Sequence, residues 1–136
     1  RSKPTKSSAA SDVYKRQDYH HYINWLAHSD ATLTFPQTVV LRYTLQEIGI
    51  ADKAAEGYRR WFVARLKLLE QTLESREYLC SNRFTIADIC VSYALHLAKS
   101  LQIEEAFKPN IKRWTDMLFD RDGFNRAVSI RYKEPE

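Results

Sequence analysis

Residues 83–89 read RFTIADI, and a long segment of apolar periodicity begins within them. Thr85 at a helix N-cap can accept a hydrogen bond from the backbone N–H of Asp88, and the Asp88 side chain can reach back to the N–H of Thr85. This reciprocal arrangement is a capping box, which stabilises a helix start by about 1–2 kcal/mol. The residues alone therefore predict that Thr85 and Asp88 are structural and carry no chemistry.

The segment that follows the capping box predicts a buried helix. Val91 and Leu95 are apolar and lie off the main stripe, so we expect this helix to be buried on more than one side. The main stripe itself has the spacing of one helical face, and its members are Ile86, Ile89, Cys90, Tyr93, Ala94, Leu97, Ala98 and Leu101.

Upstream of the box, two further long helices are predicted. Residues 18–33 show a three-to-four apolar spacing, and Pro36 is expected to kink this helix or to start a second one that continues to Gly49. Asp52 is a suitable N-cap for a helix that ends near Leu73. The apolar stripe of that helix consists of Tyr58, Trp61, Phe62, Leu66, Leu69 and Leu73.

Downstream of the box, residues 110–119 predict a helix with Ile111, Trp114 and Leu118 on one face, and residues 124–128 predict a short turn of helix. No segment alternates as a strand does. The predicted fold class is therefore all-α, a bundle of about five helices.

The positive charge of the chain is confined to its first seventeen residues. They contain five basic residues and one acidic residue, while residues 18–136 contain sixteen of each and are neutral. This distribution argues against nucleic acid as a partner, since such proteins carry a basic patch on the folded domain. We expect residues 1–17 to be a disordered leader because a segment of this composition cannot bury enough apolar surface to fold.

The leader also looks foreign to the domain. Residues 7–17, SSAASDVYKRQ, resemble the in-frame translation of a sequencing-library adapter, which would make residues 1–17 a read-through artefact. A natural basic targeting leader is the alternative. The folded domain is accordingly expected at residues 18–136.

The residues predict neither a metal site nor a membrane span. Cys80 and Cys90 stand ten residues apart without a C-x-x-C pattern, as expected of two ordinary thiols in a reducing cytoplasm. No run of about 18 apolar residues exists. No metal-binding pair is expected among the histidines, which are interpreted as surface residues: His20, His21, His28 and His96.

Asp30 is the one carboxylate in the stretch SDATLTF, which is otherwise apolar or small. A charge in that setting either lies on a solvated flank of the helix or is directed at a ligand or partner. The residues alone leave both interpretations open.

Several segments together resemble the C-terminal helical domain of bacterial glutathione transferases, over essentially all of residues 18–136. YLCSNRFTIADI is similar to that family's loop into its central buried helix. KPNIKRW and RDGFNRAV resemble two later family segments in order and separation, and WLAHSDATLTFP resembles the first helix of the domain.

The resemblance implies half of a larger cytoplasmic enzyme, usually a homodimer, that conjugates glutathione as co-substrate to apolar electrophiles without another cofactor. The family's thioredoxin-like domain, which activates the glutathione thiol, would precede residue 18 and has no counterpart in this chain. We therefore expect the fragment alone to be inactive. Whether the complete protein is catalytic stays open, because similar helical domains also serve as non-enzymatic docking modules.

The resemblance further implies roles for particular residues. Thr34, Phe35 and Leu97 match positions in the wall of the electrophile pocket, and Asp30 matches an acidic residue that holds the glutathione amine in some members. Ser81 stands where glycine is usual in the family, so this loop must manage without the freedom of glycine at positive φ.

Overall fold

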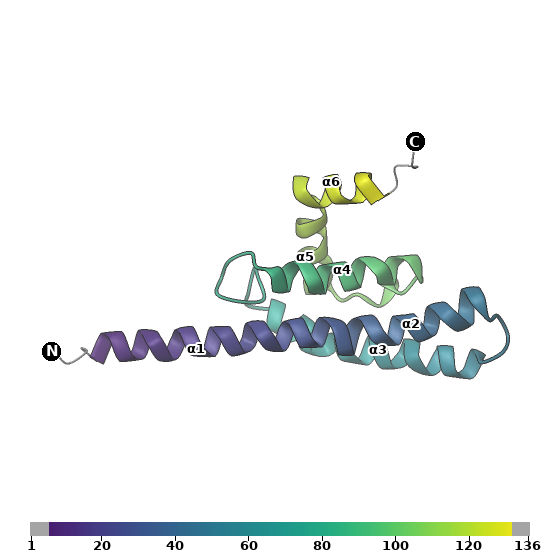
Figure 1. Cartoon of the computed structure of the whole chain (residues 1–136), viewed down its shortest axis with the longest axis horizontal. Coiled ribbons are helices and arrows are strands. Elements are labelled where there is room, and N and C mark those ends of the chain that lie inside the picture. Colours follow the sequence, from purple (N-terminus) through teal and green to yellow (C-terminus); the bar gives the residue numbers. More distant parts are fainter. Residues whose placement is uncertain (1–5, 132–136) are drawn as a thin grey trace.

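The computed structural model describes residues 6–131, with side chains from Arg16 onward, and every regular element among these residues is helical. The elements are α1 (Lys6–Ala27), η1 (His28–Thr34), α2 (Phe35–Leu41), η2 (Arg42–Gln46), α3 (Asp52–Leu73), α4 (Ile86–Ser100), η3 (Glu104–Ala106), α5 (Pro109–Phe119) and α6 (Asp122–Arg131). Because α1 through η2 form one continuous rod, the described chain has five helical rods (Figure 1). The predicted all-α class is confirmed.

The first rod contains two π-helical segments, η1 and η2. Pro36 lies in the first turn of α2, directly after η1, where the helix lacks the N–H of proline without being broken. The helix was expected to be interrupted at Pro36. The structure instead shows a π-helical turn at residues 28–34, and the helix continues through Pro36. Gly49 adopts a positive φ of 81° in the turn that follows the rod, as a helix stop requires.

The rod begins at Lys6, well before the start expected near Asp18. Residues 6–17 therefore have a helical backbone where the composition predicted disorder. This segment contains no glycine or proline, and adding a residue to an existing helix is far easier than nucleating a new one. The foreign origin of the leader and the boundary at residue 18 stay predictions.

Helix α3 packs against α2, contacts η1 and η2 as well, and closes the helical hairpin. The buried part of its predicted stripe is Phe62, Leu66, Leu69 and Leu73. Tyr58 is only half-buried and Trp61 is 37 % exposed, so the outer end of the stripe faces solvent. The N-cap is Ala51, and Asp52 is the first helical residue instead of the cap that we expected.

The capping box at the start of α4 is confirmed. Asp88 is fully buried, and one carboxylate oxygen accepts from the backbone N–H of Thr85 at 2.8 Å and from the Thr85 hydroxyl at 3.0 Å. The other oxygen accepts from the backbone N–H of Leu79 at 2.9 Å. Asp88 therefore fixes the preceding loop as well as the helix start.

The predicted buried stripe of α4 is partly wrong: Ala94, Ala98 and Leu101 are buried as predicted, but three other members are exposed. The expected burial of Val91 and Leu95 off this stripe is confirmed. The face in the core consists of Ala87, Asp88, Val91, Ser92, Ala94, Leu95 and Ala98. Ile86, Ile89 and Tyr93 are 57 %, 49 % and 46 % exposed, although they belong to the predicted stripe. Both faces of this helix are apolar, and the smaller side chains face the neighbouring rods, where helices can approach closely.

The start of helix α5 is capped by a side chain of α3. The N-cap residue of α5 itself, Lys108, forms no side-chain capping hydrogen bond. The Glu70 carboxylate accepts from the backbone N–H of Asn110 at 3.2 Å and from that of Ile111 at 3.0 Å. The predicted face of Ile111, Trp114 and Leu118 is buried, as expected.

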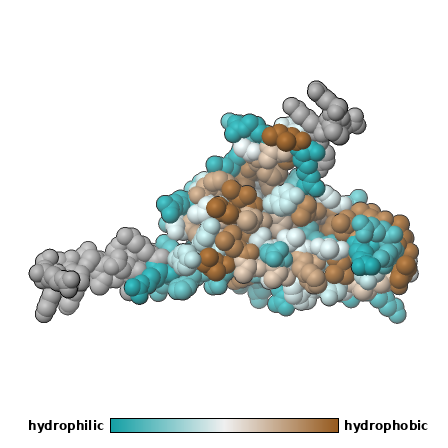
Figure 2. Space-filling model, in the orientation of Figure 1, coloured by the Kyte–Doolittle hydropathy of each residue, from teal (hydrophilic) through white to brown (hydrophobic). Residues whose placement is uncertain are grey.

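Figure 2 shows apolar surface gathered at the end of the molecule where the first rod turns into α3. The exposed aliphatic residues there include Leu45, Ile48 and Ile50. They lie apart from the residues to which the resemblance gives a role.

Candidate functional site

The segment that carries three of the four predicted site residues is the π-helical η1 and the residue after it. Asp30 is exposed, and its carboxylate has no hydrogen-bond or ion-pair partner among the described residues. Thr34 is half-buried, and its hydroxyl donates to the carbonyl of Ser29 at 2.8 Å. π-Helical turns inside α-helices are rare and occur frequently at functional sites.

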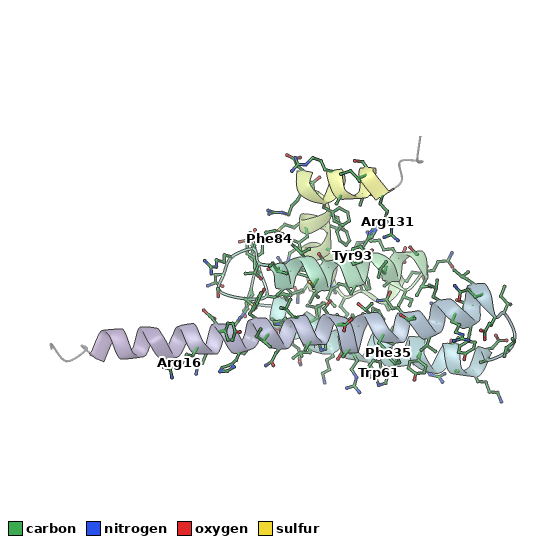
Figure 3. All side chains as sticks on the ribbon, in the orientation of Figure 1. Arg16, Phe35, Trp61, Phe84, Tyr93 and Arg131 are labelled. Carbon is green, nitrogen blue, oxygen red and sulfur yellow. The ribbon has the colours of Figure 1, made fainter. Side chains whose placement is uncertain are left out.

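Phe35 lines a groove between the first rod and α3, which we name the aromatic groove. Its ring meets that of Tyr58 edge to face, with ring centroids 6.2 Å apart. The groove has a volume of about 560 Å³ and is lined by Ala31, Phe35, Ala54, Gly57, Tyr58 and Trp61. Figure 3 shows Phe35 and Trp61 on the same side of the α2–α3 hairpin. This groove offers apolar and aromatic contacts without a charged lining residue.

Leu97 lies elsewhere. It is half-buried on α4, and the aromatic groove has no α4 residue in its lining. The link between the two regions is Gln37 of α2, whose amide donates to the carbonyls of Leu33 at 2.9 Å and Ala94 at 2.8 Å. Asp30, Thr34 and Phe35 therefore lie in one segment, and of the four predicted site residues only Phe35 lines the aromatic groove.

A larger hollow, which the residues did not predict, lies between α4, α5 and α6. We name it the α4–α6 pocket. It has a volume of about 730 Å³ and is lined by Phe84, Ile89, Ser92, Tyr93, His96, Leu118, Arg121, Asp122, Gly123, Phe124, Arg126, Ala127, Val128 and Arg131. The available signal in the sequence is the pair of arginines within RDGFNRAV, Arg121 and Arg126.

Aromatic rings hold two of the arginines of this pocket in place. The guanidinium of Arg121 lies over the ring of Phe84, 3.8 Å from its centroid. Arg131 donates to the hydroxyl of Tyr93 at 2.8 Å, and Figure 3 shows this pair between α4 and α6. Arg126 lines the same pocket. The lining of this pocket therefore combines three arginines and one aspartate with apolar and aromatic side chains.

Two histidines that we expected at the surface are half-buried. His28 packs edge-on against Trp25 at 5.3 Å and has no hydrogen-bond partner for Nε2 among the described residues. Burial lowers the pKa of His28, and the nearby Arg65 lowers it further. Burial likewise lowers the pKa of His96, with Lys99 and Arg131 contributing.

The remaining chemistry of the described residues is limited. Cys80 is buried, and desolvation with the charge of Asp88 raises the pKa of its thiol to about 11, so it is a poor nucleophile. Among the side chains that the structure describes, those of residues 16–131, no group of three or more metal-ligating residues is found. None of the helices in that range has the length and hydropathy that a bilayer crossing requires.

Comparison with known proteins agrees with this fold. The family described as "Glutathione S-transferase, C-terminal domain" matches residues 46–122. The glutathione transferase URE2P8 of Phanerochaete chrysosporium, solved with oxidized glutathione, superposes with a TM-score of 0.70 at 20 % identity, over 84 % of this chain and 53 % of that one. URE2P6 of the same organism, also solved with oxidized glutathione, gives 0.72 at 22 %, over 84 % and 54 %.

A curated relative has a different function in its name. Valine--tRNA ligase of Takifugu rubripes is 26 % identical over 107 residues, which are 76 % of this chain and 9 % of the ligase. The chain therefore spans about half the length of the similar transferases and a small part of the ligase.

Proposed function

Since the chain belongs to the glutathione S-transferase C-terminal domain family, we propose that it is the helical half of a glutathione transferase. In this proposal it forms the wall of the electrophile pocket and part of a homodimer interface, in a cytoplasmic enzyme that takes glutathione and an apolar electrophile. The observation that carries the proposal is the π-helical η1, which contains the exposed Asp30 directly before Ala31, a lining residue of the aromatic groove.

Asp30 has the properties that an ammonium-binding residue needs. Its carboxylate is exposed and unpaired among the described residues, so binding the glutathione amine would break no existing contact. A hydrogen bond to a charged group contributes about 1.5–3 kcal/mol. Loss of that carboxylate should therefore weaken binding of glutathione about tenfold or more.

The aromatic groove has the properties that an apolar electrophile needs. Phe35 is 56 % exposed in this chain, and Tyr58 and Trp61 extend the same apolar surface along α3. An aromatic contact contributes about 0.5–1.5 kcal/mol beyond its buried area. Thr34 and Leu97 stay in the proposal as wall residues of the complete protein, and neither of them lines the aromatic groove in this chain. The exposed Leu68 of α3, which lies outside the groove, is proposed to face a second copy.

The test uses the complete protein, recovered with its upstream reading frame. Initial rates of glutathione conjugation to 1-chloro-2,4-dinitrobenzene should show a higher KM for glutathione in Asp30→Asn and a higher KM for the electrophile in Phe35→Ala. Leu45→Ala is the matched control, because Leu45 is an equally exposed apolar residue of the same rod outside the groove. Wild-type protein without conjugating activity would rule out the proposal.

A non-enzymatic docking role is the second candidate, and the similarity to a tRNA ligase favours it. In that role the helical domain binds other components of the translation machinery. The same preparation decides between the two. Retention of an inactive protein by aminoacyl-tRNA synthetases in a purified pull-down would support docking, whereas conjugating activity that depends on Asp30 and Phe35 would support the transferase.

A further inference from the structure

We propose that Gln37 is a positioning residue, which holds the π-helical η1 against α4 and thereby fixes the direction of Asp30 relative to Phe35. Gln37 lines neither the aromatic groove nor the α4–α6 pocket, so it acts through the segment that precedes it. The consequence for substrate binding rests on the proposed function, whereas the control of η1 concerns this chain alone.

The pitch of η1 decides how Asp30 and Phe35 are oriented to each other. The backbone N–H of Phe35 donates to the carbonyl of Asp30, five residues earlier, which is the π-helical pattern. A π-helical turn holds more residues than the roughly 3.6 of an α-helical turn, so side chains after it are rotated about the helix axis relative to those before it. Asp30 lies near the start of η1, and Phe35 directly follows its end. A return to α-helical pitch would therefore change the angle between the carboxylate and the ring.

Pro36 disfavours a regular α-helix at this point but does not by itself select the π-helical turn. In an α-helix the ring of a proline clashes with the carbonyl of the residue four positions earlier, here Thr32. Either a sharp kink or a wider turn relieves such a clash. A further contact must therefore decide between the two.

The side chain of Gln37 supplies that contact. Gln37 is 4 % exposed, and its amide nitrogen donates to the carbonyl of Leu33 in η1 at 2.9 Å and to the carbonyl of Ala94 in α4 at 2.8 Å. The second partner lies 57 residues away along the chain, so this bond fastens the end of η1 to a neighbouring helix. Within η1, the Thr34 hydroxyl donates to the carbonyl of Ser29, again five residues earlier.

The orientation of the amide shows that stability alone does not explain a glutamine at this position. Both partners are carbonyl oxygens, which only accept, so the NH₂ group must face them. The amide oxygen Oε1 is then buried without a hydrogen-bond partner among the described residues. A buried acceptor without a partner destabilises a fold, and an apolar side chain of similar length would avoid that cost. The two donors therefore serve the placement of η1.

Amide hydrogen exchange tests the control of η1 in the ¹⁵N-labelled 136-residue chain. Gln37→Met removes both donors and the unpaired acceptor but keeps the length of the side chain. Exchange at Phe35, whose N–H forms the π-helical hydrogen bond, should become about threefold to tenfold faster. Exchange in α5 should stay unchanged, and the urea midpoint should move by less than about 0.5 M. Gln37→Leu, which also lacks both donors, replaces the variant if Gln37→Met does not fold.

The matched control is Thr115→Val. Thr115 is also buried, and its hydroxyl donates to two backbone carbonyls of its own helix, α5. This variant removes buried side-chain hydrogen bonds at a distance from η1. Exchange at Phe35 should therefore keep its wild-type rate.

Kinetics of the complete protein test the consequence for binding. Gln37→Met should raise the KM for glutathione and for 1-chloro-2,4-dinitrobenzene about threefold to tenfold each and change kcat less than about twofold. A loss of stability alone would reduce the amount of active enzyme, which lowers the apparent kcat and leaves both KM values unchanged. Because Gln37 is proposed to act through Asp30, its effect on the KM for glutathione should disappear in an Asp30→Asn background. Thr115→Val should leave both KM values unchanged.

The two experiments fail in distinguishable ways. Exchange at Phe35 that is unchanged in Gln37→Met, or that rises equally in α5, would overturn the control of η1. Unchanged KM values in an active Gln37→Met enzyme, or an equal rise of the KM for glutathione in the Asp30→Asn background, would overturn the positioning role. Wild-type protein without conjugating activity would refute the proposed function instead, and the exchange experiment would still decide whether Gln37 holds η1.

Discussion

Asp88→Ala should destabilise the folded domain more than any other single change at the start of α4. The buried carboxylate accepts three hydrogen bonds, two from the backbone N–H groups of Leu79 and Thr85 and one from the Thr85 hydroxyl. Each buried donor left without a partner costs about 1–3 kcal/mol, although the hydroxyl can turn elsewhere. We therefore expect a loss of about 3–5 kcal/mol, a large part of the roughly 5–15 kcal/mol that holds a domain of this size.

Urea unfolding followed by circular dichroism at 222 nm measures this loss, and Asp116→Ala is the matched control because Asp116 is an exposed aspartate of α5. Thr85→Ala should cost less, about 1 kcal/mol, since both backbone donors keep Asp88 as their acceptor. A loss below about 1 kcal/mol in Asp88→Ala would refute the structural role, because the capping box alone contributes that much. In the complete protein, Asp88→Ala should lower the melting temperature far more than the turnover of the enzyme that remains folded.

Two further predictions concern the loop before α4 and the buried histidines. Ser81 adopts a φ of 53°, so Ser81→Gly should raise the free energy of unfolding by up to about 1 kcal/mol in the same urea assay; a decrease would contradict the strain. His28 and His96 have lowered pKa values when folded, so the unfolded chain binds protons more readily as pH falls below their ordinary value of 6.5. The melting temperature should consequently fall from pH 7.5 to pH 5.5, and less steeply in His28→Gln/His96→Gln, with His20→Gln as the exposed control. An equal slope in the double variant would exclude these two groups as the source.

Features of the fold that depend on neighbours in the chain were predictable. The capping box requires only the Thr85-x-x-Asp88 spacing, and the stop at Gly49 requires only a residue that tolerates positive φ. The buried face of α4 was only partly predictable, because Ile86 and Ala87 begin two overlapping apolar stripes. Which stripe is buried depends on the helices that pack on it.

The candidate site shows the same division. Asp30, Thr34 and Phe35 could be placed together because they are close in the chain, and the family resemblance supplied their roles. The edge-to-face contact of Phe35 with Tyr58 joins two rods and has no local signature. The α4–α6 pocket joins residues from Phe84 to Arg131, so its aromatic and basic side chains looked unrelated along the chain.

The capping of α5 by Glu70 has a consequence for the order of folding. Helix α5 has 11 residues, too few for a stable helix in isolation, and its first backbone donors find their acceptor 40 and 41 residues earlier in the chain. Its first turn can therefore become protected against hydrogen exchange only after α3 has docked. The amides of Asn110 and Ile111 are thus reporters of assembly between the two helices, since their protection measures tertiary contact and not local helix formation.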